Sequence, residues 1–511
     1  MSAAGSIQGP DLAARAGMRM AQEEAALLEE FDFWRNNSRP NTDFAKNQTQ
    51  ILRITGEIKA YLDDKRQQTE QEPDLLERQA QRNGGLLYAN YVWAYFRTKF
   101  AQRRVDAFTG VLGCTDEYAW ECYSPARRCA EAAGKIAGDK IKEPPLTFFD
   151  SDVTPYMRGR RSLYTPEGVG KLQTEFEGLK ATLAALPVPL VSLPWLQVGH
   201  LPAAVAIAHE IGHVVEHDFE LQDAYQAAIA ALPLKDRGSA WAAWESEMFA
   251  DVYGCLCAGP AYVLTLIDFL AGPQHEVGYE PVDLADPGDY PPRKVRIAFN
   301  LDVLAALGID DAGAAALWQG AYGEPAPPAP DYGPLYDDAT KVAAALLDTQ
   351  LPVFGGQAIR AVTDLPAEDK HSTRQWRGIV VEWQGSEEER KADQQLSPAE
   401  RRSQRLNRPG ITGRAADLLE LQDAAIYSLQ EPDFFRKWMA AAALAYYSNP
   451  DAYAAKRLGS RLKARLPKAI TGATRGGKPG TVVTDQVAKE MDLRATGSAL
   501  AAHFGELGIG G

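Results

Sequence analysis

Cysteine, histidine and long apolar runs are all scarce in this sequence. Five cysteines among 511 residues are too few for a disulfide scaffold, so we expect a reducing compartment, by default the cytoplasm. No run of about 18 apolar residues occurs, and the best candidate, 181–198, is interrupted by prolines. The first residues lack the basic and apolar segments of a signal peptide. We therefore expect no membrane span, while export without a cleavable signal remains open.

The charge balance is acidic and restricts the expected partners. The formal net charge is −14, which makes the surface as a whole poorly suited to nucleic acid or an anionic membrane. Hydrophobic residues make up 45% of the chain and charged residues 24%, as in ordinary globular proteins. A basic stretch at 456–478 is interpreted as a solvated helix face. We expect no nucleic-acid partner.

Periodicity and composition predict a mostly α (α+β) fold with four regions. Apolar residues at three- and four-residue spacing predict helices near both ends of the chain, with Gly84-Gly85 as a break between two of them. A proline-rich stretch has the composition of a linker. The regions are an N-terminal helical region (1–85), a core (86–323), the linker (324–335) and a C-terminal helical region with flexible segments (336–511). The expected helices are 23–33, 50–64, 86–100, 339–347, 415–429 and 434–447, and the polar stretch 386–408 is expected to be a loop.

Two short apolar segments in the core predict a small sheet. Residues 146–149 are apolar and follow two prolines. Residues 187–193 combine apolar and β-branched residues with prolines, which is typical of an edge strand. Such an edge could hold an extended peptide by strand addition. Pro202 then stands where the first turn of a helix accepts proline, and that helix is expected to run to about His217.

Four of the seven histidines lie between His200 and His217, and two of them form an H-E-x-x-H motif. His209 and His213 are four residues apart, so both rings lie on one helix face and can reach a single metal ion. Glu210 lies beside the first histidine, where a carboxylate can take a proton from metal-activated water. His217 lies eight residues after His209, which is about 12 Å along a straight helix and too far for both to bind one ion. His217 and His200 are therefore expected to be surface or supporting residues.

A zinc site needs a third protein ligand, and the segment around Glu247 offers one. Glu247 and Asp251 are four residues apart and share a helix face. Glu247 can bind the metal, and Asp251 can accept a hydrogen bond from a ligand histidine and so fix its tautomer. Glu245 points to another face and is the weaker ligand candidate.

H-E-x-x-H followed by E-x-x-A-D resembles the gluzincin zinc metallopeptidases. Glu247 to Asp251 preserves the Glu, Ala and Asp of the second motif. Downstream, Tyr290-Pro291 and Arg296-Ile297 are similar to an H-P-x-x-x-x-R-[IV] segment in one branch of that family, with Tyr290 replacing the histidine. The resemblance covers about 100 residues and implies a zincin-like core, with a small mixed sheet, an active-site helix and one zinc ion.

The resemblance implies a zinc-dependent endopeptidase. Its metal ligands would be His209, His213 and Glu247, and Glu210 would be the general base. Tyr290 could donate to the oxyanion, and Arg296 could orient the site or pair with a carboxylate. The substrate would be a protein or peptide, and a regulatory protein partner remains open. The alternatives are an interaction scaffold with a structural or vestigial zinc site and a protease effector that is exported to act in another cell.

Overall fold

The computed structural model describes part of the chain, and within that part the fold is mostly helical, as predicted. The described residues are 11–39, 42, 44–136, 143–152, 154–158, 188–309, 311–323, 330–363 and 434–463. They belong to two compact units, divided after Arg104, which are described separately. The segments 386–408 and 415–429, and most of the proline-rich linker, lie outside the described residues.

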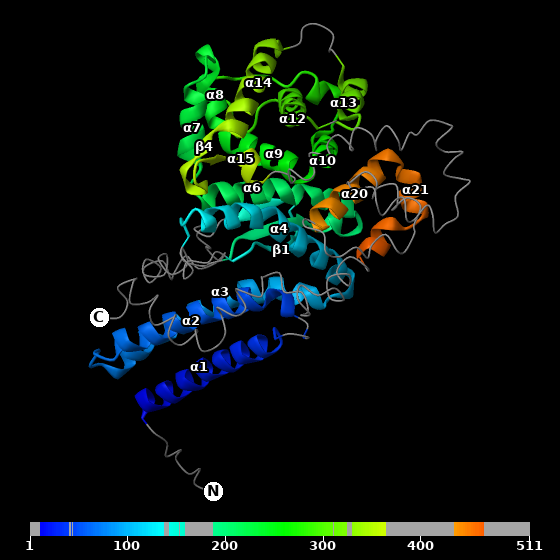
Figure 1. The fold of residues 1–511 in the computed structure, drawn as a ribbon. Coiled ribbons are helices and arrows are strands. Elements are labelled where there is room, and N and C mark those ends of the chain that lie inside the picture. Colours follow the sequence, from blue (N-terminus) through cyan, green and yellow to red (C-terminus); the bar gives the residue numbers. More distant parts are fainter. Residues whose placement is uncertain are drawn as a thin grey trace. The chain divides into compact units, whose positions relative to one another are not determined.

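The first unit contains three long helices, α1 (Leu12–Asn36), α2 (Gln48–Thr69) and α3 (Leu75–Ala101), which pack together (Figure 1). The carboxylate of Asp11 caps α1, and that of Asp74 caps α3, each by accepting backbone N–H groups of the first turn. The three helices contain the segments 23–33, 50–64 and 86–100, in which the apolar spacing predicted helix.

The expected break at Gly84-Gly85 is wrong, because α3 continues through both glycines. A Cβ atom added to Gly85 would lie 3.3 Å from Lys65 Cγ and 3.4 Å from the Tyr61 hydroxyl, both on α2. Because Gly85 has no side chain, α2 and α3 can pack closely there. From the sequence alone, a glycine that allows close helix packing looks the same as a glycine that ends a helix.

In the second unit, α4 (Asp106–Ala132) packs against a three-stranded sheet of order β1–β3–β2. Strand β1 (Leu146–Asp150) is parallel to β3 (Leu190–Pro194), and β2 (Tyr156–Arg158) is antiparallel to it. The expectation that 187–193 forms an edge strand is therefore wrong. The prolines lie at the ends of β3 or before it, so its interior keeps the backbone N–H groups that pair on both sides.

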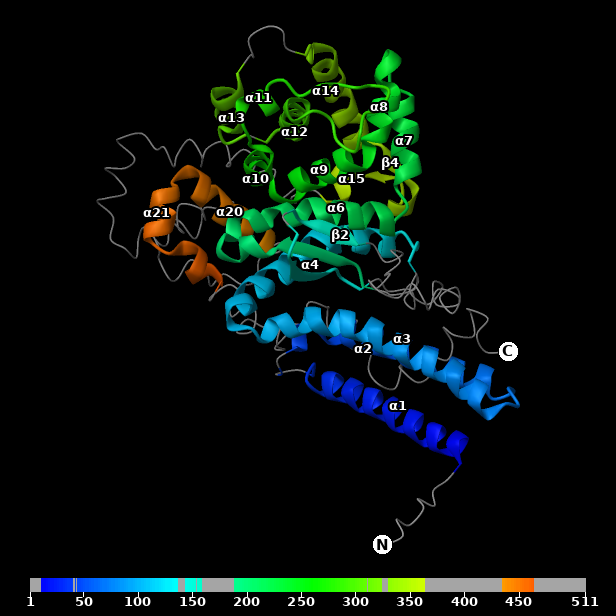
Figure 2. The same ribbon diagram turned by 180° about the vertical axis from the view of Figure 1, so that it is seen from behind.

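Helix α6 (Ile207–Asp218) carries the H-E-x-x-H motif. It lies between two layers, with α4 and the sheet on one side and α9 (Glu245–Ala258) on the other (Figures 1 and 2). The 3-10 turn η5 (Leu201–Ala206), with Pro202 near its start, leads into α6. Ile207, Ile211 and Val215 of α6 are fully buried, because the helix has neighbours on both faces.

The other elements of this unit complete the packing around α6 and α9. They are α7 (Gln222–Ala230), α8 (Gly238–Ala243), α10 (Pro260–Leu270), α11 (Gln274–Val277), α12 (Arg293–Leu307), α13 (Ala314–Tyr322), α14 (Gly333–Asp348), α15 (Ile359–Val362), α20 (Phe434–Ser448), α21 (Pro450–Ala455), β4 (Gln350–Leu351) and β5 (Gln357–Ala358). The short 3-10 turns of this unit also include η4 (Trp195–Gly199), η6 (Lys235–Arg237) and η7 (Pro352–Phe354), whereas η1 (Ala45–Asn47) and η2 (Gln102–Arg104) belong to the first unit.

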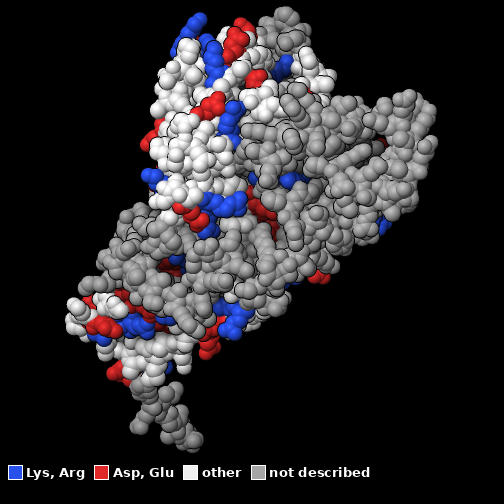
Figure 3. Space-filling view, viewed as in Figure 1, with Lys and Arg blue, Asp and Glu red and all other residues white. Residues whose placement is uncertain are grey.

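The surface and the helix lengths agree with the composition. Acidic and basic side chains are interspersed over the described part of the face in Figure 3. No helix among the described residues is both long enough and apolar enough to cross a membrane. All five cysteines are described, and none of them forms a disulfide.

Close contact between α6 and α9 depends on Gly212, the residue before the second motif histidine. A Cβ atom added there would lie 2.7 Å from Ala250 Cα, which is closer than real Cβ contacts come.

We expect Gly212→Ala to lower the free energy of unfolding by about 1–3 kcal/mol, because the backbones of α6 and α9 would have to separate. Urea unfolding measures this change. Gly238→Ala is the control, since a Cβ there meets nothing within 4 Å and the backbone is already helical. Equal effects of the two substitutions would contradict the packing explanation.

Candidate metal centre

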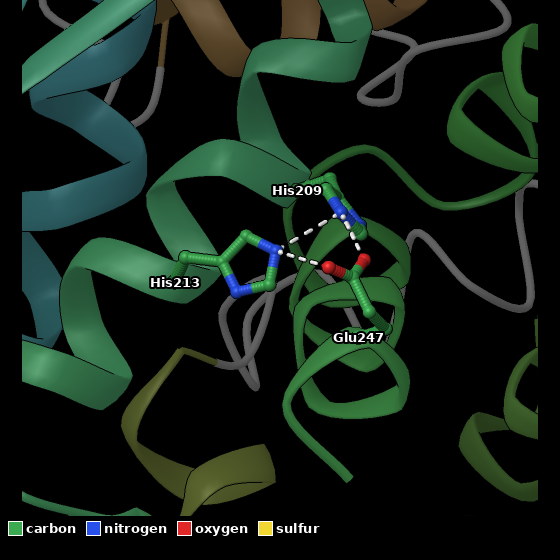
Figure 4. Close-up of side chains that lie close together, drawn as sticks. All are labelled: His209, His213 and Glu247. Atoms are coloured by element: carbon green, nitrogen blue, oxygen red, sulfur yellow. Dashed lines mark hydrogen bonds and ion pairs between the residues drawn. The ribbon is translucent and has the colours of Figure 1, made fainter. Parts of the chain in front are cut away.

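Three side chains converge where α6 packs against α9. His209 and His213 come from α6, and Glu247 comes from the first turn of α9 (Figure 4). The Nε2 atoms of the two histidines are 3.2 Å apart. Glu247 places Oε2 3.1 Å from His209 Nε2 and Oε1 3.4 Å from His213 Nε2. The structure thus brings together the three residues that the sequence suggested as metal ligands.

These spacings fit a tetrahedral metal ion. Zinc binds histidine nitrogen and carboxylate oxygen at about 2.0–2.2 Å, so two ligand atoms in a tetrahedron lie about 3.3 Å apart. The three separations in the cluster lie between 3.1 and 3.4 Å. Two histidine nitrogens and one carboxylate also form a donor set that leaves a fourth position for water or substrate. The cluster could therefore hold one zinc ion.

Asp251, one turn after Glu247, fixes the orientation of His209. Its Oδ1 lies 2.9 Å from His209 Nδ1, so that nitrogen can donate its proton to the carboxylate while Nε2 faces the cluster. Arg296 of α12 donates two hydrogen bonds of 2.8 Å to Asp251. Asn300 donates a third at 2.9 Å, and the Tyr262 hydroxyl donates a fourth at 2.5 Å. Together with His209, these groups supply hydrogen-bond donors to both oxygens of the buried Asp251 carboxylate.

Charge interactions outweigh burial at this pair. Burial raises the pKa of Asp251, but Arg296 and His209 outweigh it and hold the pKa well below its usual range. Burial likewise lowers the pKa of His209, but Asp251 and Glu247 outweigh it and raise the pKa to about 10. Asp251 is thus a permanent anion beside His209.

The two residues suggested for catalysis lie beside the cluster. Glu210 is buried on α6, and this burial raises the pKa of its carboxyl group, with the charges of His209 and His213 acting against it. Tyr290 lies in the loop before α12, is about half exposed (49%), and its ring covers Arg296 with 4.7 Å between the guanidinium carbon and the ring centre. Burial and the nearby Glu247 carboxylate raise the pKa of Tyr290 to about 12, so its hydroxyl remains a proton donor at neutral pH.

The other residues considered from sequence lie outside the cluster. His217 is exposed at the end of α6, and His200 packs its ring against Tyr446, with 4.6 Å between ring centres. Glu245 is fully buried on α9 beside Glu216, and burial together with that second carboxyl raises the pKa of Glu245 to about 10.

Sequence reasoning missed Tyr262, Asn300 and Ser246. Asn300 follows Arg296 by four residues, so a shared helix face could have indicated it. Tyr262 lies beyond the helix break at Gly259, and no local spacing links it to Asp251. Ser246 lies between Glu245 and Glu247, whose carboxylates are the more obvious ligand candidates, yet its hydroxyl is 3.2 Å from His213 Nδ1.

Comparison with known proteins returns no match: no family model, no curated protein and no solved structure resembles this chain significantly. The chemical interpretation of the cluster therefore depends on its geometry and on its motifs.

The buried pair of Arg296 and Asp251 gives a stability prediction. Arg296→Met should lower the free energy of unfolding by about 3–5 kcal/mol, because it leaves a buried carboxylate without its cation. Chemical denaturation measures the change. The control is Arg293→Met, which removes a partly exposed contact of 4.0 Å with Glu280 and should change stability by less than about 1 kcal/mol. A small effect at Arg296 would show that Asp251 does not need this partner.

Proposed function

We propose that the chain is a zinc-dependent endopeptidase of the gluzincin type, built on a zincin-like core. The observation that carries the proposal is the convergence of His209, His213 and Glu247 at the ligand spacing of a tetrahedral ion, with Glu210 beside the first ligand. An acidic residue at that position is not needed to hold a purely structural metal. It is needed to move a proton during hydrolysis.

The side chains around the cluster have separate roles in the proposed reaction. A zinc ion held there would act as a Lewis acid, which makes water more acidic and polarises a carbonyl oxygen. Glu210 takes the proton from the attacking water and delivers it to the leaving amine. Its raised pKa, caused mainly by burial, brings the carboxyl group closer to the range in which it can both accept and donate a proton.

Tyr290 would assist at the substrate carbonyl. Its protonated hydroxyl can donate a hydrogen bond to an oxyanion, and its partial exposure leaves it accessible from solvent. Arg296 lies against the tyrosine ring and also binds Asp251, so one guanidinium holds both the ring and the carboxylate that orients His209.

Strand β2 is the better candidate for binding an extended peptide. Among the described residues it pairs only with β3, and it packs against α6, which carries His209 and His213. A substrate strand could add to its other edge through backbone hydrogen bonds. This replaces the interpretation of 187–193 as the docking edge, since β3 is already paired on both sides. The proposed substrate is accordingly a protein or peptide, met in a reducing compartment such as the cytoplasm.

Replacing the proposed general base tests the proposal directly. Glu210→Gln should reduce peptide hydrolysis by about 10²–10⁴-fold, because the amide cannot accept the proton, while zinc content stays unchanged. New protein N-termini in a cell lysate, compared between wild type and variant, reveal cleavage even though the substrate is unidentified. The exposed Glu276→Gln is the control and should cleave as wild type does. Equal cleavage by the Glu210 variant would contradict the assignment. A zinc-loaded wild type that cleaves nothing would favour the scaffold alternative.

The role of Tyr290 has a separate signature. Tyr290→Phe should lower kcat by about 10²–10³-fold with a much smaller change in KM, because the lost hydrogen bond forms to the oxyanion rather than to the ground state. Steady-state kinetics on a peptide found in the cleavage comparison provide the measurement. If KM rises while kcat is unchanged, Tyr290 binds substrate and does not stabilise the oxyanion.

A further inference from the structure

Each candidate ligand histidine has an outer nitrogen that faces away from the cluster. For His209 that nitrogen meets Asp251 directly. For His213 it lies 3.2 Å from the hydroxyl of Ser246, on α9. The Ser246 hydroxyl in turn donates a hydrogen bond to Oε2 of Glu216, on α6. A chain of two hydrogen bonds thus runs from a ligand of the candidate site to a second carboxylate.

Glu216 lies in an enclosed position. The residue is 6% exposed, and its neighbours include the fully buried Glu245 and Tyr225. A carboxylate kept inside a protein needs hydrogen-bond donors, since an unsatisfied one is costly. The Ser246 hydroxyl supplies such a donor to Oε2 of Glu216, so the serine serves the carboxylate as well as the histidine.

We propose that Glu216 is a positioning residue for His213, acting through the hydroxyl of Ser246. The inference rests on the proposed function in that the site binds zinc. His213 Nδ1–H donates to Ser246 Oγ, and the serine hydroxyl donates to Glu216, so Nε2 carries the lone pair that faces Glu247. Because a carboxylate ends the chain, the histidine becomes a more basic ligand, as in carboxylate–histidine–zinc arrangements.

The two ligand histidines are then supported in different ways. His209 has its carboxylate in direct contact. His213 reaches its carboxylate through a residue of the neighbouring helix, directly before Glu247 in sequence. The chain of hydrogen bonds leaves α6 at His213, crosses to α9 at Ser246 and returns to α6 at Glu216. It therefore fixes the ring of His213 relative to the helix that supplies the third ligand.

A double-mutant cycle on zinc affinity tests the chain of hydrogen bonds. Ser246→Ala should raise the zinc Kd of the full chain about 10–100-fold, measured by competition with a chromophoric chelator. Glu216→Gln should raise it in the wild-type background and have no further effect in the Ser246→Ala background, because the two residues act in series. Ser246→Thr keeps the hydroxyl and should restore an affinity close to wild type. Ser239→Ala, an exposed serine on α8, is the control and should leave the Kd unchanged.

The outcomes separate this inference from a structural role and from the proposed function. Additive effects of the two substitutions, or lower stability with an unchanged zinc Kd, would overturn the positioning role. If Glu216→Gln fails to fold, the difference between Ser246→Ala and Ser246→Thr decides the question. A zinc Kd that is unchanged by these substitutions would overturn only this inference. A chain that binds no zinc would overturn the proposed function as well. Absence of peptide cleavage leaves the zinc measurement valid.

Discussion

The buried carboxylate of Asp251 is the interaction on which the candidate site depends. It accepts hydrogen bonds from His209 on α6, Tyr262 on α10, and Arg296 and Asn300 on α12, so one anion joins three helices to its own. A charge in such a place must be fully compensated, because water cannot reach it. The compensation orients His209 toward the cluster. The hydrogen bonds of the Asp251 carboxylate therefore both hold the helices together and set the geometry of the site.

Two glycines allow this arrangement by letting backbones and rings approach. Gly212 places α6 against Ala250 of α9, which brings both histidines within reach of Glu247. The ring of Tyr262 lies against Gly254, where a Cβ would come within 2.8 Å of it. From there the tyrosine hydroxyl reaches Asp251. A larger residue at Gly212 would move the ligand histidines, and one at Gly254 would move Tyr262. The spacing of the cluster therefore depends on glycine at both positions.

Local spacing placed each pair of cluster residues on a helix face and predicted several of the helices, but it did not show which distant segments pack together. His209 and His213 lie one turn apart, and the next ligand and Asp251 repeat that spacing, so each pair could be placed on a helix face from sequence. Which helix faces meet is decided by packing over tens of residues, and Tyr262 and Ser246 were missed for that reason. Strand β3 was misassigned as an edge because its partners β1 and β2 lie far from it in sequence. Composition revealed its prolines but not its neighbours.

X-ray absorption at the zinc edge, on the full chain loaded with zinc, tests the metal centre most directly. The geometry predicts one ion per chain, bound by two imidazole nitrogens and a carboxylate oxygen at about 2.0–2.2 Å, with a light atom in the fourth position. In Glu247→Ala the carboxylate contribution should disappear while the two imidazoles remain. An ion with only one imidazole ligand, a spectrum unchanged by that substitution, or no bound zinc would contradict the site formed by His209, His213 and Glu247.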